Sequence, residues 1–209
     1  MEPTDSTTAA TLQNRTIEIA RTLSPNLAAA IATVEPIELV PRQDAPFPER
    51  LCRAIVGQQL SVKAAAAIWG RLLAQAGEQS LIEHLQQSSP EQLRRCGLSG
   101  AKAKAVGAIA VAAQAGELSG EVLGRLTVAE RNQKLTALWG VGQWTADMMN
   151  IFYFGEPDIW PEGDTAARKT LARLTNGQGK TQDIAVQFAP YRSYLALYLW
   201  RYLDATPEG

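Results

Sequence analysis

Two glycines one residue apart, Gly140 and Gly142, constrain the fold of this chain more than any other feature. They interrupt an apolar run between two helical patterns, in the segment LWGVGQWTA. Glycine accepts positive φ angles and lets another backbone approach closely, so the pair predicts a hairpin too tight for side chains. A new helix is expected to begin at Gln143, and its first N–H groups have no acceptor within that helix. Such a helix start is a binding site for anions, with phosphate the obvious one.

The composition favours helices throughout the chain. The 209 residues are 46% apolar, which is enough to form the core of one large domain or two small ones. Alanine is frequent and alternating strand patterns are scarce. No apolar run reaches the length of a membrane span. Because the N-terminus is polar and lacks an apolar signal core, we expect a cytoplasmic protein, associated with the nucleoid if it is bacterial.

Cysteine and histidine usage excludes several kinds of site. Cys52 and Cys96 are too few for a disulfide scaffold and lack zinc-site spacing, so both are predicted to be ordinary helix or core residues. His84 is the only histidine and lies far in sequence from the glycine pair, so we expect it at the surface. Catalysis by histidine is therefore not expected.

Helical patterns follow an N-terminal tail, residues 1–15, that is predicted to be disordered. A helix is predicted over 15–34 with an interruption at Pro25, and four prolines indicate a connecting loop over 36–48. The last predicted helix is strongly apolar and is expected to pack against the N-terminal helix. Further helices are predicted near 48–57, 61–76, 79–87, 90–96, 100–116, 127–137, 143–153, 164–174, 181–188 and 190–203. The expected N-caps are Ser61, Ser99, Thr127 and Asp164.

The charge distribution leaves two interpretations open. A formal net charge of −1 argues weakly against a nucleic-acid binder, since such domains are often basic. Two segments are nevertheless locally basic, 91–110 with a single acid and 165–180 with none. Each is either a solvated helix face, which is the commoner case, or a flank of a phosphate-tracking surface. Their basic residues are Arg94, Arg95, Lys102 and Lys104 in the first, and Arg168, Lys169, Arg173 and Lys180 in the second.

A lone carboxylate opens a predicted helix twenty residues after Trp144, at the end of the segment DIWPEGD. By itself, Asp164 is most simply a helix N-cap. Together with the hairpin, it suggests an acid that acts on DNA held by backbone amides. Asp158 and Glu162 are the rival carboxylates, the first as a brace or cap for the loop and the second as a supplementary charge.

The ordered combination of these segments resembles the helix-hairpin-helix DNA glycosylase superfamily, most closely its 3-methyladenine DNA glycosylase II branch. LWGVGQWTA and WPEGD carry the resemblance, and it extends over residues 48–203. It implies an all-α fold of two helical subdomains with the active-site cleft between them. We expect one subdomain from 16–47 with 165–209 and the other from 48–164. The additional matching segments are AIVGQQLSVKAAAAIW (54–69), LSGAKAKAVGAIA (98–110) and APYRSYLALYLW (189–200).

The resemblance implies an enzyme that rotates an alkylated purine nucleotide out of duplex DNA and then hydrolyses the N-glycosidic bond that holds the base. Residues Gln58, Gln59 and Leu60 would be the wedge that fills the vacated stack; alternatively, they are two polar surface residues and a core leucine. A cationic base would be favoured on aromatic faces. The predicted base pocket consists of Trp144, Met148, Trp160 and Tyr191. The alternative is that such residues are simply core, which we prefer for Trp139 and Trp200.

Asp164 would stabilise the positive charge that develops on the sugar and orient the attacking water. One carboxylate suffices because an alkylated base is a good leaving group. The carbonyls of Leu138 and Gly140 are implied to hold Na⁺ or K⁺, and no other cofactor is expected. The residues predicted to contact the DNA backbone are Gly140, Val141, Gly142, Gln143, Thr145, Ser99, Gly100 and Lys102.

Departures from the family pattern narrow the expected activity. Bifunctional members carry a lyase lysine where this chain has Trp144, and without that amine no Schiff base forms there. Members with an iron–sulfur cluster carry four cysteines near the C-terminus, and this chain has none beyond Cys96. We therefore expect a compact, monomeric, monofunctional enzyme without a cluster. The alternatives are a non-catalytic helix-hairpin-helix DNA-binding module and a related glycosylase for a different lesion.

Overall fold

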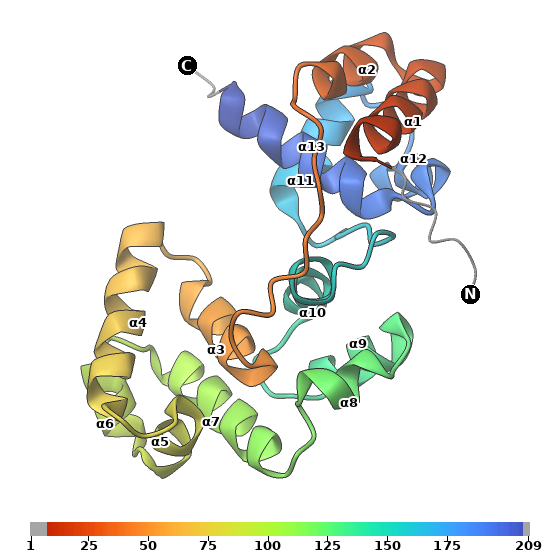
Figure 1. Ribbon diagram of the computed structural model, residues 1–209. Coiled ribbons are helices and arrows are strands. Elements are labelled where there is room, and N and C mark those ends of the chain that lie inside the picture. The colour runs from red at the N-terminus through yellow and green to blue at the C-terminus, as the bar shows by residue number, and fades with distance from the viewer. Residues whose placement is uncertain (1–7, 207–209) are drawn as a thin grey trace. The chain divides into compact units, whose positions relative to one another are not determined.

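The computed structural model describes residues 8–206, and every regular element within that range is a helix (Figure 1). The chain divides into two compact units. The terminal unit comprises Met1–Pro41 and Gly155–Gly209, and the hairpin unit comprises Arg42–Phe154. The predicted all-α class is confirmed.

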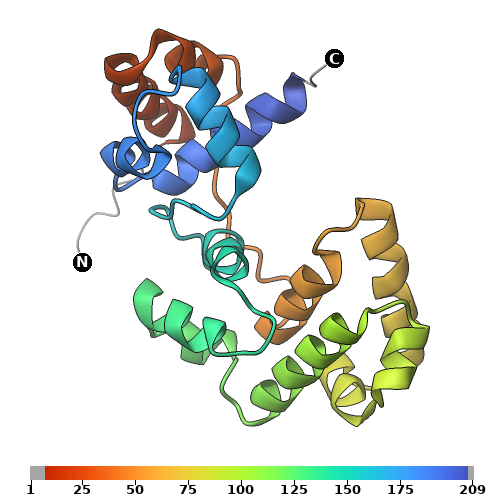
Figure 2. The same ribbon diagram turned by 180° about the vertical axis from the view of Figure 1, so that it is seen from behind.

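The terminal unit joins the two ends of the chain around one apolar core. Its last helix, α13, packs on α2 and α11 (Figure 2). Tyr198 of α13 is fully buried in a core cluster that includes Leu27 and Phe188. The strongly apolar C-terminal helix therefore returns to the N-terminal helices, as predicted. The helices of this unit are α1 (Ala9–Leu23), α2 (Pro25–Ala32), α11 (Thr165–Leu174), α12 (Thr181–Ala185), the 3₁₀ turn Val186–Phe188 and α13 (Arg192–Ala205).

The hairpin unit has its own core, in which α7 packs against α3, α5 and α6. Cys52 and Cys96 are both buried in this core, as predicted. One short helix, α8, was not predicted, because glycines at both ends of GEVLG hide a single turn that Ser119 caps. The helices are α3 (Phe47–Gly57), α4 (Val62–Ala76), α5 (Leu81–Gln87), α6 (Pro90–Arg95), α7 (Gly100–Gln114), α8 (Gly120–Gly124), α9 (Val128–Thr136), α10 (Gln143–Met149) and the π-helical turn Asn150–Phe154.

The prediction of a disordered tail over residues 1–15 is wrong for its second half. Helix α1 begins at Ala9, because the Thr8 side chain accepts a hydrogen bond from the backbone N–H of Thr11. Leu12 is buried, so this turn is also stabilised by packing. Residues 1–7 lie outside the described part of the chain.

All four predicted N-caps are confirmed. Ser61, Ser99, Thr127 and Asp164 each accept a hydrogen bond from the backbone N–H three residues further on. Thr127 also forms a capping box with Glu130, whose side chain accepts from the Thr127 N–H. These helix starts were predictable because a cap depends only on residues within one turn.

The boundaries between the units differ from the predicted ones. Residues 155–164, here called the Pro/Gly loop, belong to the terminal unit rather than the hairpin unit. Ser193 on α13 ties the loop down, since its Oγ accepts from the Ile159 N–H at 3.0 Å and donates to the Glu156 carbonyl at 2.7 Å. Residues 42–47 belong to the hairpin unit, where the Arg42 N–H donates to the Phe152 carbonyl. None of the described helices is both long and apolar enough to cross a membrane.

Candidate functional site

The predicted glycine hairpin is present between α9 and α10. The Val141 N–H donates to the Leu138 carbonyl at 3.1 Å and closes the turn. Gly140 has a φ of 86°, and a Cβ added there would lie 2.7 Å from the Cβ of Ala105 on α7. Glycine is therefore required at this position for two reasons, the positive φ and the close approach of Ala105.

Gly142 serves a different purpose from Gly140. Its backbone is extended, and no atom lies within 4 Å of a Cβ added there, so this side of the hairpin faces open space. Gly142 is the N-cap of α10 and provides no side-chain cap. The open backbone is the kind of surface to which a phosphate can come close, whereas the side chain of Val141 is buried.

The first turns of α10 have a buried face and an exposed face, and Thr145 lies on the buried one. Thr145, which we predicted to contact DNA through its hydroxyl, is only 2% exposed. Its Oγ accepts a hydrogen bond from Gln58 Nε2 at 3.0 Å, so that prediction is wrong for the side chain. The exposed Gln143 donates from Nε2 to Asp147 Oδ1 at 2.8 Å.

Asp147 is a buried carboxylate that the sequence analysis did not single out. It is only 5% exposed, and this burial raises its pKa to about 6, with the Gln143 hydrogen bond opposing the shift. Helical spacing from Gln143 was the one available signal, since residues four apart share a helix face.

The wedge prediction falls on a distorted turn between α3 and α4. Gln58 ends α3 in an extended conformation, and the exposed Gln59 has a φ of 55°, which is unusual for a residue with a Cβ. Leu60 is 40% exposed, so the alternative reading of a core leucine is wrong. We call Gln58, Gln59 and Leu60 the wedge turn.

Lys102 lies beside the wedge turn but is engaged differently from the prediction. Its Nζ donates to the carbonyl oxygens of Val56 at 2.8 Å and Gln58 at 2.7 Å. The ammonium is therefore directed at protein carbonyls, whereas we had expected it to contact phosphate. Ser99 and Gly100 are exposed at the start of α7, where Ser99 Oγ accepts from the Lys102 N–H.

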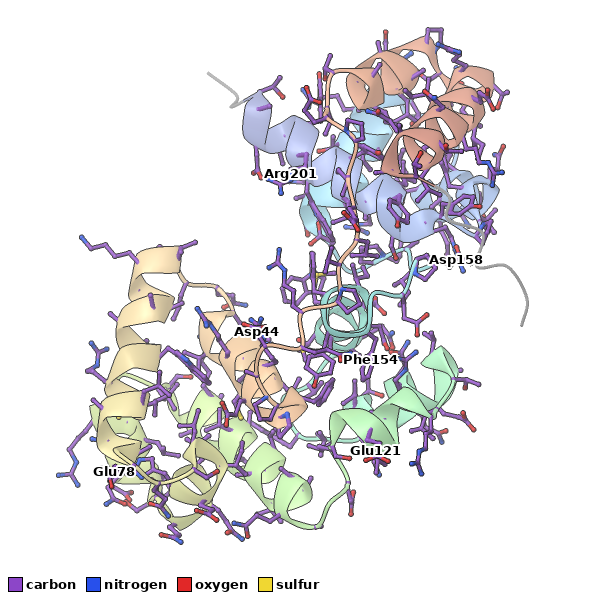
Figure 3. All side chains as sticks on the ribbon, in the orientation of Figure 1. Asp44, Glu78, Glu121, Phe154, Asp158 and Arg201 are labelled. Carbon is purple, nitrogen blue, oxygen red and sulfur yellow. The ribbon has the colours of Figure 1, made fainter. Side chains whose placement is uncertain are left out.

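The aromatic and sulfur side chains near the hairpin differ in exposure. Trp144 is 37% exposed, and Met148, one turn later, lines a cavity of about 220 Å³ with three arginines and Phe152. Trp139 is 46% exposed, and the Lys104 Nζ lies 4.3 Å from its ring centroid. The core assignment of Trp139 is therefore wrong. The three arginines are Arg42, Arg50 and Arg53, of which Arg50 also pairs with Asp44, labelled in Figure 3.

In the terminal unit, Asp164 lies where the Pro/Gly loop meets α11. Its Oδ1 accepts two hydrogen bonds, from the Ala167 N–H at 2.8 Å and from Trp200 Nε1 at 3.1 Å. The carboxylate is half-buried and its orientation is fixed by these two donors. Trp200 was predicted to be plain core, so its contact with Asp164 was missed; no local sequence signal links two residues on α13 and α11.

The rival carboxylates have structural partners. Asp158, labelled in Figure 3, accepts from Arg192 Nε at 2.7 Å and from its Nη2 at 3.0 Å. The hydrogen bond and charge of Arg192 hold the pKa of Asp158 below its usual value. Glu162 accepts from Trp160 Nε1 at 2.5 Å and from the hydroxyl of Thr181. Asp158 therefore braces the loop, as one of its predicted roles required.

The two predicted pocket aromatics of the terminal unit lie in different surroundings. Trp160 belongs to the Pro/Gly loop, and its side chain is buried in the core of the unit. Tyr191 is half-buried at the start of α13, where its hydroxyl accepts from Arg15 Nη1 at 2.8 Å and its ring meets Tyr194 edge-on. Of the two, Tyr191 has the more accessible ring, and base stacking by either residue stays a prediction.

The predicted cation site consists of backbone carbonyls in the hairpin. The Leu138 carbonyl already accepts from Val141, but a carbonyl oxygen has a second lone pair that suits a hard cation. Gly140, with its positive φ, supplies the other carbonyl. Carbonyl oxygens are chemically suited to Na⁺ or K⁺, and the presence of a cation at this turn stays a prediction.

Comparison with known proteins assigns this arrangement to a family. The family described as HhH-GPD superfamily base excision DNA repair protein matches residues 52–189, which include the hairpin, the wedge turn and Asp164. The chain belongs to this superfamily. Individual members share about a third or less of their aligned residues with this chain, and the alignments extend over most of it.

One relative is DNA-3-methyladenine glycosylase 1 of Schizosaccharomyces pombe, 33% identical over 161 residues, covering 73% of this chain and 71% of that protein. Among solved structures, the DNA-3-methyladenine glycosidase of Bacillus halodurans has a TM-score of 0.75 at 31% identity, covering 90% of this chain and 88% of that one. The 3-methyladenine DNA glycosylase of S. pombe in complex with abasic DNA also has a TM-score of 0.75, at 26% identity, covering 91% and 97%.

Proposed function

We propose that this protein is a monofunctional DNA glycosylase of base excision repair that removes alkylated purines, of the 3-methyladenine and 7-methylguanine type, from duplex DNA. The observation that carries the proposal is the half-buried carboxylate of Asp164, held by the Ala167 N–H and the Trp200 indole. The names of the relatives support the same activity. A DNA-binding module would need no fixed acid at this position.

Binding to DNA begins at the open backbone of the hairpin. The N–H groups around Gly142 and the start of α10 suit phosphate oxygens, as does the Ser99-capped start of α7. Such contacts position the duplex and carry no sequence information, so recognition depends on the lesion. The protein acts as a monomer in this proposal, with DNA as its partner.

Eversion of the damaged nucleotide exposes it to the enzyme and leaves a gap in the stack. The exposed Gln59 and Leu60 of the wedge turn are suited to fill that gap. An N3- or N7-alkylated purine is cationic, and an aromatic face attracts it by ~0.5–2 kcal/mol. Of the three aromatic residues predicted for the base pocket, Trp144 and Tyr191 are more exposed than Trp160.

The chemical step breaks the bond between C1′ of the deoxyribose and the base nitrogen. The bonding electrons leave with the base and neutralise its positive charge, so no strong general acid is needed. The carboxylate of Asp164 stabilises the oxocarbenium character on the sugar. Water then attacks C1′ and loses its proton to Asp164 or solvent, leaving a free base and an abasic site. Residue 144 is a tryptophan and has no amine that could form a Schiff base, so we propose no lyase activity at this position.

The substitution Asp164→Asn tests the proposal. Asparagine is an equally good N-cap and keeps an oxygen that can accept from Ala167 and Trp200, so only the charge is removed. We expect the rate of base release from randomly methylated DNA, measured by mass spectrometry, to fall by about 10²–10³-fold. The exposed Asp183 provides a matched control, and Asp183→Asn should release bases at the wild-type rate.

Release by Asp164→Asn at the wild-type rate would refute an acid-assisted mechanism. The same assay separates the lesion classes when 3-methyladenine, 7-methylguanine and 8-oxoguanine are compared side by side. A preference for 8-oxoguanine would assign the protein to a different branch of glycosylases. DNA binding without release of any of the three bases would favour a non-catalytic module.

A further inference from the structure

The wedge turn is held from two sides by partly buried polar contacts. On one side, the Lys102 Nζ donates to the carbonyls of Val56 and Gln58 at 2.8 and 2.7 Å. On the other side, Gln58 Nε2 donates to the Thr145 hydroxyl at 3.0 Å. Residues from α7 and α10 therefore converge on one position of the turn, Gln58.

The turn requires such support because of its backbone. Helix α3 ends here, and the last carbonyls of a helix have no donor within the helix. A cation placed there satisfies them and is favoured by the helix dipole. Gln59 has a φ of 55°, a conformation that a residue with a Cβ adopts only where its surroundings impose it.

Lys102 is built into the structure and is not a loose surface cation. Its backbone is fixed in the first turn of α7 by the Ser99 cap. Its side chain is half-buried with the ammonium 2.8 and 2.7 Å from two protein carbonyls, and this burial lowers the pKa of Lys102. A lysine that binds phosphate would instead be expected to point into solvent in the free protein.

We propose that Lys102 is a positioning residue that holds the wedge turn ready for insertion into DNA. It acts through Gln59 and Leu60, and it is not one of the phosphate contacts. Thr145 supports the same turn from the hairpin side. The inference rests on the proposed function, because a wedge is useful only to an enzyme that everts a nucleotide.

The substitution Lys102→Met tests this role, because it keeps an unbranched side chain of nearly the same length as far as Cε and removes the ammonium donors. We expect single-turnover excision from methylated duplex to slow by about tenfold. With 2-aminopurine placed next to the lesion, the fluorescence gain on eversion should fall in parallel. Affinity for undamaged duplex and its dependence on salt should remain as in wild type. The control is Lys134→Met, since Lys134 is likewise engaged by the protein but away from the wedge turn, 3.3 Å from Glu117.

A phosphate contact would behave in the opposite way. Its removal weakens binding to every duplex and reduces the salt slope by about one, with the excision rate of bound DNA unchanged. That result, or excision by Lys102→Met at the wild-type rate, would overturn the inference. Thr145→Val removes the other contact without changing charge and should slow excision in the same manner.

A double-mutant cycle guards against a general loss of structure. If Lys102 acts through the wedge, Lys102→Met should have little further effect in a Gln59→Ala, Leu60→Ala background. Additive losses would instead indicate that Lys102 acts elsewhere, and the inference would be rejected. If the wild-type protein releases no methylated base, the proposed function itself is refuted. If the wild-type protein is active and Lys102→Met excises bases at the same rate, this inference alone is refuted.

Discussion

At the scale of single residues, the three carboxylates of the Pro/Gly loop differ in their hydrogen-bond partners. Asp158 pairs with Arg192, and Glu162 is occupied by Trp160 and Thr181. Asp164 is held by donors that fix its orientation and carry no formal charge. The carboxylate is therefore held in a defined position, which our proposal requires of an acid that stabilises a cationic sugar.

The indole of Trp200 should matter for catalysis through its N–H. Trp200→Phe keeps an aromatic ring on α13 and removes the donor to Asp164 Oδ1. Loss of one hydrogen bond to a charged acceptor should lower kcat by about tenfold, corresponding to ~1.4 kcal/mol. Steady-state kinetics on methylated DNA would measure this. A raised KM with kcat intact would instead assign Trp200 to substrate binding.

Combining the two changes tests how Trp200 acts. In an Asp164→Asn background, Trp200→Phe should have almost no further effect on the rate, because its partner has already lost its charge. Tm values of each variant show whether stability has changed as well.

Asp147 should make stability depend on pH. Burial raises the pKa of its carboxyl to about 6 in the folded protein, against an unfolded value near the ordinary 3.8. The neutral form is favoured by folding, so its contribution is fully present below about pH 4 and lost as pH rises through 6. We expect Asp147→Asn to equal wild type at pH 4 and to be more stable by about 2 kcal/mol at pH 7.5.

Urea unfolding at the two pH values measures this difference. Asparagine can still accept from Gln143 Nε2, so the local hydrogen bond is retained. Asp204→Asn, at an exposed position on α13, is the control and should show no such pH-dependent gain. An equal effect of Asp147→Asn at both pH values would contradict the raised pKa.

At the scale of elements, the two glycines of the hairpin have different surroundings and therefore different expected roles. Gly140 packs against Ala105 with a positive φ, and Gly142 has an extended backbone facing open space. The first glycine is therefore needed to dock the hairpin on α7, and the second to leave room in front of α10.

Alanine substitutions should separate these two roles. Gly140→Ala should lower the free energy of unfolding by about 2–3 kcal/mol, because it combines an unfavourable φ with a steric clash. Gly142→Ala should change stability by less than about 0.5 kcal/mol but weaken DNA binding, since its methyl group occupies the approach of a phosphate. Urea unfolding and fluorescence anisotropy with duplex DNA are the measurements. Equal destabilisation by both substitutions would contradict this division.

At the scale of the whole molecule, each unit is built around its own core, and the chain passes between them at Pro41–Arg42 and at Phe154–Gly155. The Pro/Gly loop belongs to the unit made from both termini. Asp164 is therefore supported by α11 and α13, while the wedge turn and hairpin are supported by α3, α7 and α10. The two groups of predicted site residues depend on separate cores for their geometry.

Local sequence patterns were enough to predict four helix N-caps, the hairpin and the position of Asp164 before α11, because these features depend on interactions within a few residues. Only the tertiary structure decided the partners of Lys102, Thr145 and Trp200. Their hydrogen bonds join residues 44, 87 and 36 positions apart, which no local pattern records. Trp139 and Leu60 were misjudged or left open for the same reason, since exposure depends on what other segments cover.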